Sequence, residues 1–268
     1  MKRLRLGVIG AGFVGDAVIN GFSTDNVAIH IVDPKYTVTD IPTCVNAKPD
    51  IIFLCLPTPS NPDGSVNVDT VSLTLDHIEL LGYKGVCVIK STITPDHLNN
   101  FKNYNLRIVY NPEFLTEANA HADFINPHMQ VLGGDWSDCV EVEKAYVQYS
   151  KVKTVPTYKT DIVTASLIKY TINSWLATKV TFMNELHKLH SVSGADSTWD
   201  QFTEILKTDS RLGQTHFQVP GPDGEFGFGG HCLPKDTSAF LHYAESQDHH
   251  LEVLRTSVYL NDILFRKE

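Results

Sequence analysis

Short apolar runs alternate with longer stretches of mixed polarity through the first part of the chain. Runs rich in Val, Ile and Leu predict strands, and the longer stretches have the spacing of helices. Nearly continuous apolar strands separated by helices are typical of a parallel sheet covered on both faces, so we expect a Rossmann-type, doubly wound α/β domain over residues 1–158. The predicted strands are Leu4–Ile9, Val27–Val32, Ile51–Leu56, Gly85–Ile89, Leu106–Tyr110 and Gln130–Leu132, and the predicted helices are Gly12–Phe22, Val68–Leu81 and Ser137–Tyr149.

The pattern changes near Thr160. One long helix is predicted from Asp161 to about His190, because apolar residues recur there at helical spacing, at Ile168, Ile172, Leu176, Val180 and Met183. Thr160 and Asp161 are both candidates for its N-cap. After a shorter helix and a loop rich in Gly and Pro, Val219–Gly230, helical patterns return at 236–247 and 251–266. We expect a helical central domain over residues 159–268.

Composition narrows the class of protein. The chain has 268 residues, 42% of them hydrophobic, and a net charge of −9, which argues against wide contact with nucleic acid. Its five cysteines form no CxxC pair, so we expect neither a disulfide framework nor a bound metal. No apolar stretch reaches transmembrane length and no signal peptide is evident. We therefore expect a cytoplasmic protein with no membrane contact.

A glycine-rich turn follows the first predicted strand and opens the first predicted helix. Gly10-Ala-Gly12-Phe-Val-Gly15 has the spacing of a dinucleotide-binding loop. The first glycine permits the tight turn, the second lets backbone approach a pyrophosphate, and the third lets helix and strand pack closely. The pyrophosphate would lie at the helix N-terminus, whose free N–H groups attract negative charge.

An acidic residue ends the second predicted strand. Asp33 is where such loops place a carboxylate that binds the adenosine ribose hydroxyls. Its charge would repel the 2′-phosphate of NADP, although Lys35 close by weakens that preference. We expect NAD as the cofactor. The alternative is a glycine turn without a ligand, with Asp33 capping a loop.

One cysteine lies between a glycine-rich turn and a predicted helix. Cys232 follows Gly227-Phe-Gly-Gly230 and His231, and it precedes Leu233-Pro-Lys235-Asp236. A helix N-terminus stabilises a thiolate, so this position favours a nucleophile. Cys55 and Cys87 lie instead within apolar strands, where buried, inert thiols are usual.

Polar groups occur on the long helix and at strand ends. Lys169 and Asn173 lie one turn apart and could stabilise negative charge on a substrate oxygen, with a solvated face as the alternative. Asn111-Pro-Glu113-Phe-Leu-Thr-Glu117 follows a strand, and its two acids could orient water or cap a helix. Lys90-Ser-Thr92 also ends a strand, at the sheet edge where ligands collect in open α/β folds.

Taken in order, these segments resemble the UDP-glucose/GDP-mannose dehydrogenase family. The matches keep the family's order and span nearly the whole chain, so the resemblance is specific. The matching stretches are Gly10–Gly15, Leu56–Pro59 with Asp63–Ser65, Lys90–Thr92, Asn111–Glu117, Asp123-Phe124 with Pro127, Lys169 and Asn173 with Leu176–Lys179, Arg211–Gly213, and Gly227–Thr237.

The resemblance implies that the C6 alcohol of a nucleotide sugar is oxidised to a carboxylate with two NAD⁺ per sugar. The alcohol first becomes an aldehyde. Cys232 adds to it, because a thiohemiacetal has a hydride to give where a bare aldehyde has none, and water hydrolyses the resulting thioester. By resemblance, Lys169 and Asn173 would stabilise the oxyanion, while Asp236, Thr92 and Glu113 would position or activate water.

The resemblance also assigns binding residues and a partner. Those expected to bind the cofactor are Gly10, Gly12, Phe13, Val14, Gly15, Asp33, Lys35, Pro57, Thr58, Thr92, Glu117 and Lys235. Those expected to bind the substrate are Phe114, Leu115, Lys169, Asn173, Arg211, Phe228 and Gly229. In relatives the arginine matching Arg211 reaches the neighbouring subunit's active site, which implies a homodimer formed through the central helices.

Two departures from the family pattern affect the substrate. His231 resembles the members that act on N-acetylhexosamines, whereas Leu233-Pro-Lys-Asp236 resembles the glucose and mannose type, and UDP-glucose is the leading choice. Family members normally continue into a second α/β domain that binds the nucleotide. We expect that domain to be missing here, so that a separate chain supplies it or substrate is bound loosely.

Two other functions remain open. The β-hydroxyacid dehydrogenases also pair a glycine-loop domain with a helical domain and use a lysine and an asparagine on a long helix, but their two-electron chemistry gives the Gly227–Asp236 loop no purpose. A non-catalytic NAD-binding protein that needs a partner chain is the other alternative. The number of NADH formed per substrate separates these readings.

Overall fold

The computed structural model describes residues 3–266, so the outermost residues of both predicted domains, 1–2 and 267–268, lie outside the described part. Contacts divide the chain into two compact units, one of residues 3–59 and 66–169 and one of residues 60–65 and 170–266. The division falls inside helix α7 (Ile162–Val192), whereas the predicted limit at residue 158 precedes that helix.

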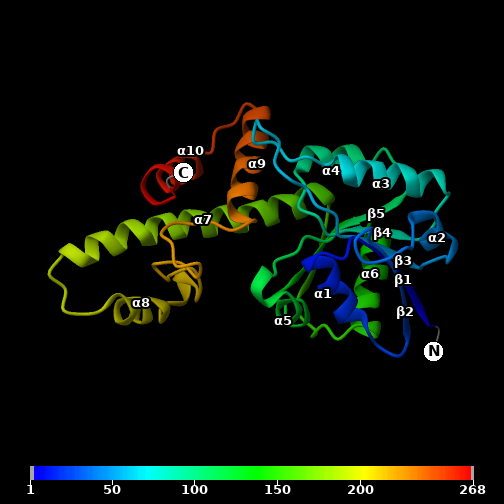
Figure 1. Ribbon diagram of the computed structural model, residues 1–268, viewed down its shortest axis with the longest axis horizontal. Helices are drawn as coiled ribbons and strands as arrows, with labels where there is room; N and C mark the ends of the chain where they lie inside the picture. Colours follow the sequence, from blue (N-terminus) through cyan, green and yellow to red (C-terminus); the bar gives the residue numbers. More distant parts are fainter. Residues whose placement is uncertain (1–2, 267–268) are drawn as a thin grey trace. The chain divides into compact units, whose positions relative to one another are not determined.

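The first unit is built on one seven-stranded sheet with the order β2-β1-β3-β4-β5-β6-β7 (Figure 1). Its strands β1 to β5 are all parallel, as the apolar pattern predicts. The strands are β1 (Leu4–Ile9), β2 (Val27–Val32), β3 (Ile51–Leu54), β4 (Val86–Ile89), β5 (Arg107–Tyr110), β6 (Gln130–Gly134) and β7 (Thr157–Thr160).

The last two strands of the sheet, β6 and β7, depart from the predicted parallel arrangement. β6 pairs antiparallel with β5, and β7 then pairs parallel with β6. The connection between β5 and β6 holds only a three-residue turn, η1 (Glu117–Asn119), and the six-residue helix α5 (Ala120–Ile125).

Helices cover both faces of the sheet. In Figure 1, α3 (Asp69–Leu80) and α4 (Pro95–Phe101) lie on one face, and α1 (Phe13–Phe22), α5 and α6 (Trp136–Tyr149) lie on the other. Every residue of β3 and β4 is buried, which explains why these strands are continuously apolar. Aromatic rings pack together on the face covered by α1, α5 and α6. The ring centroids of Phe22 and Tyr146 are 5.2 Å apart, and those of Phe22 and Phe53 are 5.4 Å apart.

The strand order locates the ligand edge. From β1 the chain passes to β2 on one side and then to β3 on the other, so the topological switch point lies between β1 and β3. In open α/β sheets ligands bind outside the carboxyl ends of the strands at this point. The glycine loop follows β1, and Cys55–Thr58 follows β3.

Several short elements were not predicted. α2 (Ile41–Asn46), α4 and α5 are too short to show a helical period, and the edge strand β7 reads Thr-Tyr-Lys-Thr without an apolar run. Local signals mark two of them, since Pro95 begins α4 and the Asp40 carboxylate accepts a hydrogen bond from the Thr43 N–H at 2.8 Å.

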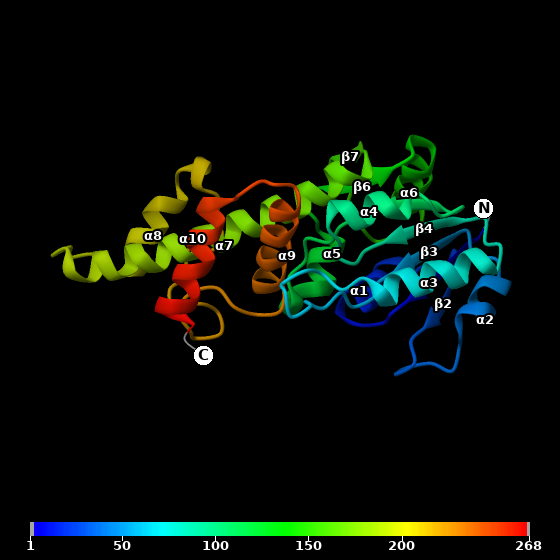
Figure 2. The same cartoon turned by 90° about the horizontal axis from the view of Figure 1, so that it is seen from above.

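The second unit is helical, as predicted, and includes α8 (Trp199–Lys207), α9 (Leu233–Ser246) and α10 (Glu252–Leu260) beside the later part of α7 (Figure 2). A small core joins Met183, Trp199, Phe217 and Val219. The continuous helix predicted over 251–266 is wrong, because α10 ends at Leu260 and the chain continues as a π-helical turn, Asn261–Phe265.

Residues 60–65 belong to this second unit although they come early in the sequence. The Ser238 hydroxyl donates to the Gly64 carbonyl at 3.3 Å, and the His242 ring lies 3.7 Å from the Asp63 carboxylate. Within the described residues, no helix combines the length and apolarity needed to span a membrane.

An aspartate caps the long helix. The Asp161 carboxylate accepts hydrogen bonds from the Thr164 N–H at 2.9 Å and the Thr164 hydroxyl at 2.6 Å. The bonds to Thr164 hold the pKa of this carboxyl below its usual value. Asp161 is therefore the N-cap, and its stabilising effect depends on its charge.

We predict that Asp161→Ala lowers the free energy of unfolding by about 1 kcal/mol at pH 7. A carboxyl whose pKa is depressed by folding contributes stability above its unfolded pKa of about 4 and loses it as the pH falls through the folded pKa. Urea melts of both proteins from pH 7 to pH 3 should therefore converge at the acidic end. Asp161→Asn keeps a neutral cap and serves as control, and a difference between alanine variant and parent that is constant with pH would contradict the assignment.

Candidate active site

The glycine loop has the form that a dinucleotide requires. Gly10 adopts a φ of +89°, in the region that favours glycine. A Cβ atom on Gly15 would overlap the Gly10 carbonyl oxygen, so α1 lies against the turn only because this residue is glycine. A Cβ on Gly12 would meet nothing within 4 Å. The space beside Gly12, at the N-terminus of α1, therefore fits a pyrophosphate, with Phe13 and Val14 in the first turn.

Asp33 is fixed at the end of β2 by two backbone donors. Its carboxylate accepts from the Ala11 N–H at 2.7 Å and from the Lys35 N–H at 2.8 Å, which ties it to the glycine loop. An ionised carboxylate can accept about four hydrogen bonds, so capacity for ribose hydroxyls remains. The Lys35 ammonium lies 5.3 Å from the centroid of the Tyr36 ring. The arrangement fits the diol of NAD.

The ends of β3 and β4 are joined by their own polar groups. The buried Thr58 hydroxyl donates to the Thr92 carbonyl at 2.9 Å. The Ser91 hydroxyl accepts from the Leu56 N–H at 3.0 Å and donates to the Leu56 carbonyl at 2.6 Å. Pro57, between them, is exposed. The structure thus places Thr58 and Thr92, predicted from separate motifs, side by side.

A buried ion pair lies at the ends of β4 and β5. The Lys90 ammonium is 2.8 Å from the Glu113 carboxylate and donates to the Asn111 side chain at 3.0 Å. Asn111 also accepts from the Tyr146 hydroxyl at 2.7 Å and donates to the Val131 carbonyl at 2.9 Å. Only 1% of the Lys90 side chain is exposed, against 15% for Glu113, and the Glu113 oxygen that pairs with Lys90 is buried.

Electrostatics follow from this burial. Burial lowers the pKa of Lys90, but Glu113, Tyr146 and Cys55 together raise it by more, so the pKa lies above its ordinary value. Burial raises the pKa of Cys55 to about 12 and that of the Tyr146 hydroxyl to about 12. Cys55 is therefore a neutral thiol, as expected for an inert cysteine. Sequence reasoning missed Asn111 and Tyr146 as partners of Lys90, although a lysine ending a fully apolar strand signals a need for buried acceptors.

The segment after Glu113 is held in place. The Phe114 N–H donates to the Glu113 carboxylate at 3.0 Å, and the Lys169 ammonium lies 5.5 Å from the Phe114 ring centroid. Leu115 packs against the core of the first unit, whereas Glu117 is exposed at the start of η1. The alternative of a solvated Lys/Asn face on α7 is wrong, because Lys169 is 6% and Asn173 7% exposed.

The second unit gathers the other predicted groups around the start of α9. Asp236 is 1% exposed and accepts from the Asn173 amide at 2.6 Å, and the Lys235 ammonium lies 2.6 Å from it. Cys232 occupies the N-cap position, half-buried, and its carbonyl accepts from the Asp236 N–H at 2.9 Å. Asn173, Asp236 and Lys235 thus form one bonded group, with Cys232 one turn before Asp236.

Arg211 is exposed on a loop that is itself fixed. Its guanidinium pairs with Asp209, with Nε 2.9 Å from Oδ1. The Lys179 ammonium donates to the Leu212 carbonyl at 2.9 Å and lies 3.6 Å from the Phe217 ring centroid. Burial, followed by the charge of Lys207, lowers the pKa of Lys179. Arg211 is therefore exposed to solvent on a loop that Lys179 holds in place.

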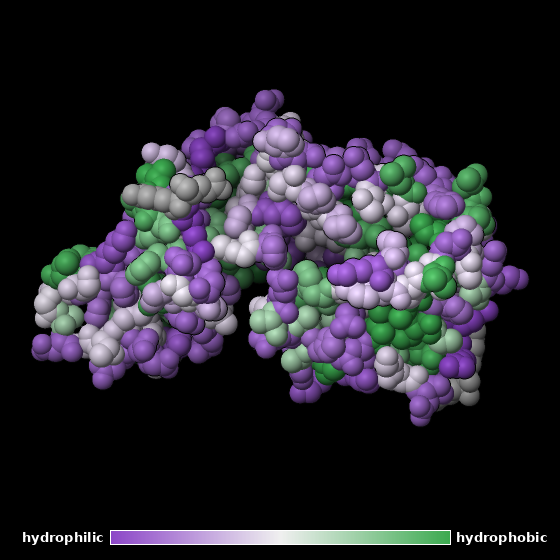
Figure 3. Space-filling view, in the orientation of Figure 1, coloured by the Kyte–Doolittle hydropathy of each residue, from purple (hydrophilic) through white to green (hydrophobic). Residues whose placement is uncertain are grey.

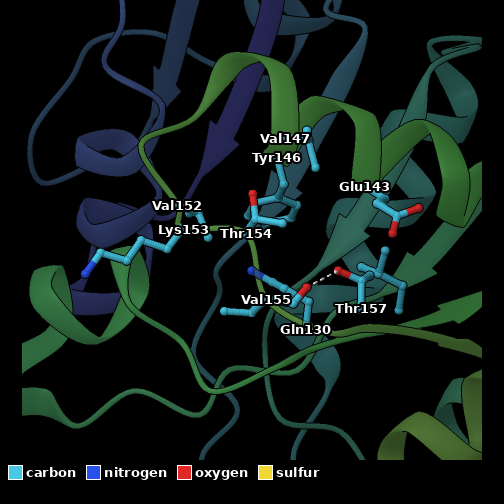
Figure 4. Close-up of a pocket in the computed structure, with 10 residues that line it drawn as sticks. Gln130, Glu143, Tyr146, Val147, Val152, Lys153, Thr154, Val155 and Thr157 are labelled. Atoms are coloured by element: carbon cyan, nitrogen blue, oxygen red, sulfur yellow. Dashed lines mark hydrogen bonds between the residues drawn. The ribbon is translucent and has the colours of Figure 1, made fainter.

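A separate pocket lies at the far edge of the sheet (Figure 4). It is lined by α6, β6 and the segment leading into β7, including Glu143, Tyr146 and Gln130. Glu143 is paired with Lys159 at 2.7 Å. None of the predicted site residues lines this pocket, and we assign it no function. Among residues 3–266, no group of three or more His, Cys, Asp or Glu side chains is placed to hold a metal ion.

Comparison with known proteins identifies both parts of the chain. Residues 35–150 match the NAD-binding domain of the UDP-glucose/GDP-mannose dehydrogenase family, and residues 163–263 match its central domain. The first match begins at Lys35, so the glycine loop and Asp33 precede it. A UDP-glucose 6-dehydrogenase of Rickettsia bellii is 36% identical over 197 residues, covering 71% of this chain and 44% of that protein.

Solved structures agree with this fold. A UDP-glucose dehydrogenase from Pyrobaculum islandicum superposes with a TM-score of 0.79 at 25% identity, over 97% of this chain and 68% of that one. A 3-hydroxyisobutyrate dehydrogenase from Mycobacterium tuberculosis gives 0.75 at 16% identity, over 96% and 92%, a likeness of fold alone.

The family matches together extend over most of the chain, which spans about half the length of the curated relatives it matches. They confirm the predicted Rossmann-like fold with its helical central domain and the prediction of NAD as cofactor. This chain belongs to the UDP-glucose/GDP-mannose dehydrogenase family, of which it carries the NAD-binding and central domains.

Proposed function

We propose that this protein oxidises the C6 alcohol of a nucleotide sugar to the carboxylate in two NAD-dependent steps, with Cys232 as the nucleophile. The observation that carries the proposal is the bonded group at the start of α9. Asn173 and Lys235 both bind the buried Asp236, one turn from Cys232 at the helix N-cap, where the helix dipole favours negative charge.

The proposed reaction balances without an external oxidant other than NAD⁺, which accepts one hydride in each oxidation. The alcohol loses a hydride and a proton to give the aldehyde. The Cys232 sulfur adds to the aldehyde carbon, and the thiohemiacetal loses a second hydride and a proton to give a thioester. Water adds to the thioester, the C–S bond breaks, and the carboxylate and the free thiol remain.

The chain's own residues have distinct tasks in this proposal. Lys169 and Asn173, both buried, stabilise the oxygen that gains negative charge. Asp236, held by two donors, and Glu113, held by Lys90, orient the hydrolytic water together with Thr92. Phe114, Leu115, Phe228, Gly229 and Arg211 contact the substrate, and Glu117 and Lys235 lie toward the cofactor.

UDP-glucose is the proposed substrate. The Leu233-Pro-Lys-Asp236 segment and the relatives named UDP-glucose 6-dehydrogenase favour it, whereas the exposed His231 resembles the N-acetylhexosamine type. The β-hydroxyacid alternative shares the fold, but it leaves the Cys232 loop without a purpose. Two expectations remain predictions: that a separate chain supplies the nucleotide-binding domain, and that the protein is cytoplasmic.

A homodimer formed through α7 is part of the proposal. Trp175, Phe182 and Leu189 are 61%, 59% and 61% exposed and recur every two turns, which places them on one stripe of the helix. Figure 3 shows apolar side chains as green patches between polar ones on the visible face. An exposed apolar stripe of this kind marks a protein contact more often than free surface.

With UDP-glucose in limiting amount and the protein in excess, we predict about two NADH for each sugar consumed, the number that a four-electron oxidation requires. Cys232→Ala should lower the yield to about one, because the aldehyde then has no hydride to give. The measurement is absorbance at the NADH band with a panel of UDP- and GDP-sugars alongside. Cys44→Ala, in α2, is the matched control. One NADH per substrate from the parent protein would instead favour the β-hydroxyacid class, and NAD binding without turnover would favour the non-catalytic alternative.

We predict that Phe182→Glu converts a dimer to a monomer at micromolar concentration, because a charge in the apolar stripe opposes its burial. Sedimentation equilibrium measures the mass directly. Leu73→Glu changes a residue of α3 that is 68% exposed and should leave the mass unchanged. A parent protein that is already monomeric, or a variant that stays dimeric, would remove this interface from the proposal.

A further inference from the structure

Two buried asparagines hold the backbone that leads to Cys232. The Gly227 N–H donates to the Asn184 side chain at 2.9 Å, from α7. The Phe228 N–H donates to the Asn261 side chain at 2.7 Å, and the Asn261 amide donates back to the Phe228 carbonyl at 3.1 Å. Asn184 is 1% and Asn261 2% exposed, so water does not compete for these bonds.

The Asn261 side chain acts on Phe228 as a neighbouring strand would. Its oxygen accepts from the N–H and its nitrogen donates to the C=O of one residue, which fixes both the orientation of the amide and the direction of the peptide. Buried backbone groups need such partners, and the loop has no sheet to supply them. The two bonds therefore define where residues 227–228 lie.

The loop and the π-helical turn are complementary in shape. Gly227 has a φ of +74°, and a Cβ there would lie 2.7 Å from the Phe265 Cβ. The Arg266 guanidinium, which follows the turn, donates to the Gly227 carbonyl at 3.3 Å and to the Asp223 carboxylate at 2.6 Å. π-Helical turns are rare and frequently occur at functional sites. Here the turn brings Asn261 and Phe265 to the same glycine.

We propose that Asn261 and Asn184 are the positioning residues of the Cys232 loop. They clamp residues 227–228 so that the short segment through Gly229, Gly230 and His231 delivers Cys232 in one half-buried position at the N-cap of α9. This inference deepens the proposed function, because the clamp matters to catalysis only if Cys232 is the nucleophile. In this proposal the π-helical turn holds the Cys232 loop in position, in addition to packing against it.

The clamp is tested by the reactivity of the Cys232 thiol rather than by turnover. Asn261→Leu removes both bonds to Phe228 at similar volume, Asn261→Asp keeps the acceptor and replaces the donor by a repelling oxygen, and Asn184→Ala releases Gly227 alone. Thr181→Val is the matched control. It removes a buried hydrogen bond of 3.2 Å between α7 and the Ser257 carbonyl of α10, and it does not touch the loop.

Each protein is treated with iodoacetamide, and the peptide that contains Cys232 is followed by mass spectrometry. We expect alkylation to be faster by roughly fivefold or more in both Asn261 variants and in Asn184→Ala, the factor by which losing one typical buried hydrogen bond changes a local equilibrium. Thr181→Val should react at the parent rate although its thermal midpoint falls by a similar amount. Melting curves identify any variant that fails to fold. If the Asn261 variants do not fold, Asn184→Ala, which leaves the two bonds between Asn261 and Phe228 in place, decides the result.

Parent-like alkylation in the folded clamp variants would overturn the proposal, as would equal acceleration in Thr181→Val. If the nucleotide sugar is turned over, the variants should also show a lower kcat with an unchanged KM for NAD⁺, since the glycine loop of the first unit is untouched. Alkylation needs no substrate. Faster alkylation in a protein that oxidises no sugar would therefore refute the proposed function and leave the clamp standing.

Discussion

The first unit depends on one steric constraint, the approach of α1 to the turn that follows β1. The helix begins at Phe13, directly after Gly12, and Gly15 lies where any Cβ would overlap the Gly10 carbonyl oxygen. That approach aims the N-terminus of α1 at the switch point between β1 and β3, and it leaves open space beside Gly12. Phosphate binding, helix packing and the place of Asp33 all follow from this single contact.

A second constraint applies to the buried charges at the strand ends. A buried ion is stable only when partners of opposite charge or hydrogen-bonding groups surround it. Lys90 is almost fully enclosed, and Glu113, Asn111 and the aromatic ring of Phe124, 5.6 Å from the ammonium, surround it. Removing one member of such a group leaves an uncompensated charge, which costs several kcal/mol. The same rule applies in the second unit, where Asp236 is held by Asn173 and Lys235. Each of the two carboxylates proposed to orient water is thus held in place by its own partners.

The uncharged backbone groups of the Cys232 loop also need partners, because buried N–H and C=O groups must form hydrogen bonds. The loop before Cys232 lies outside the sheet, yet its buried N–H and C=O groups still require partners. Asn184 and Asn261 supply them from helices, and glycine at 227 admits the close approach. These bonds suit the proposed covalent chemistry, in which the sulfur would have to be held near the position it takes in the transition state.

The sequence by itself determined the fold class, the cofactor and the family. Continuous apolar runs predict buried strands such as β3 and β4, and the glycine spacing with Asp33 predicts a dinucleotide loop, because both depend on residues close together in the chain. The tertiary structure alone decided the antiparallel pairing of β6, the partners of Lys90 and the asparagine clamp. Asn111 and Tyr146, or Asn261 and Phe228, lie far apart in sequence, and no local pattern shows which residues pair. Hydrogen bonds between distant segments exist only once packing has excluded water from both, and that exclusion is a property of the folded chain.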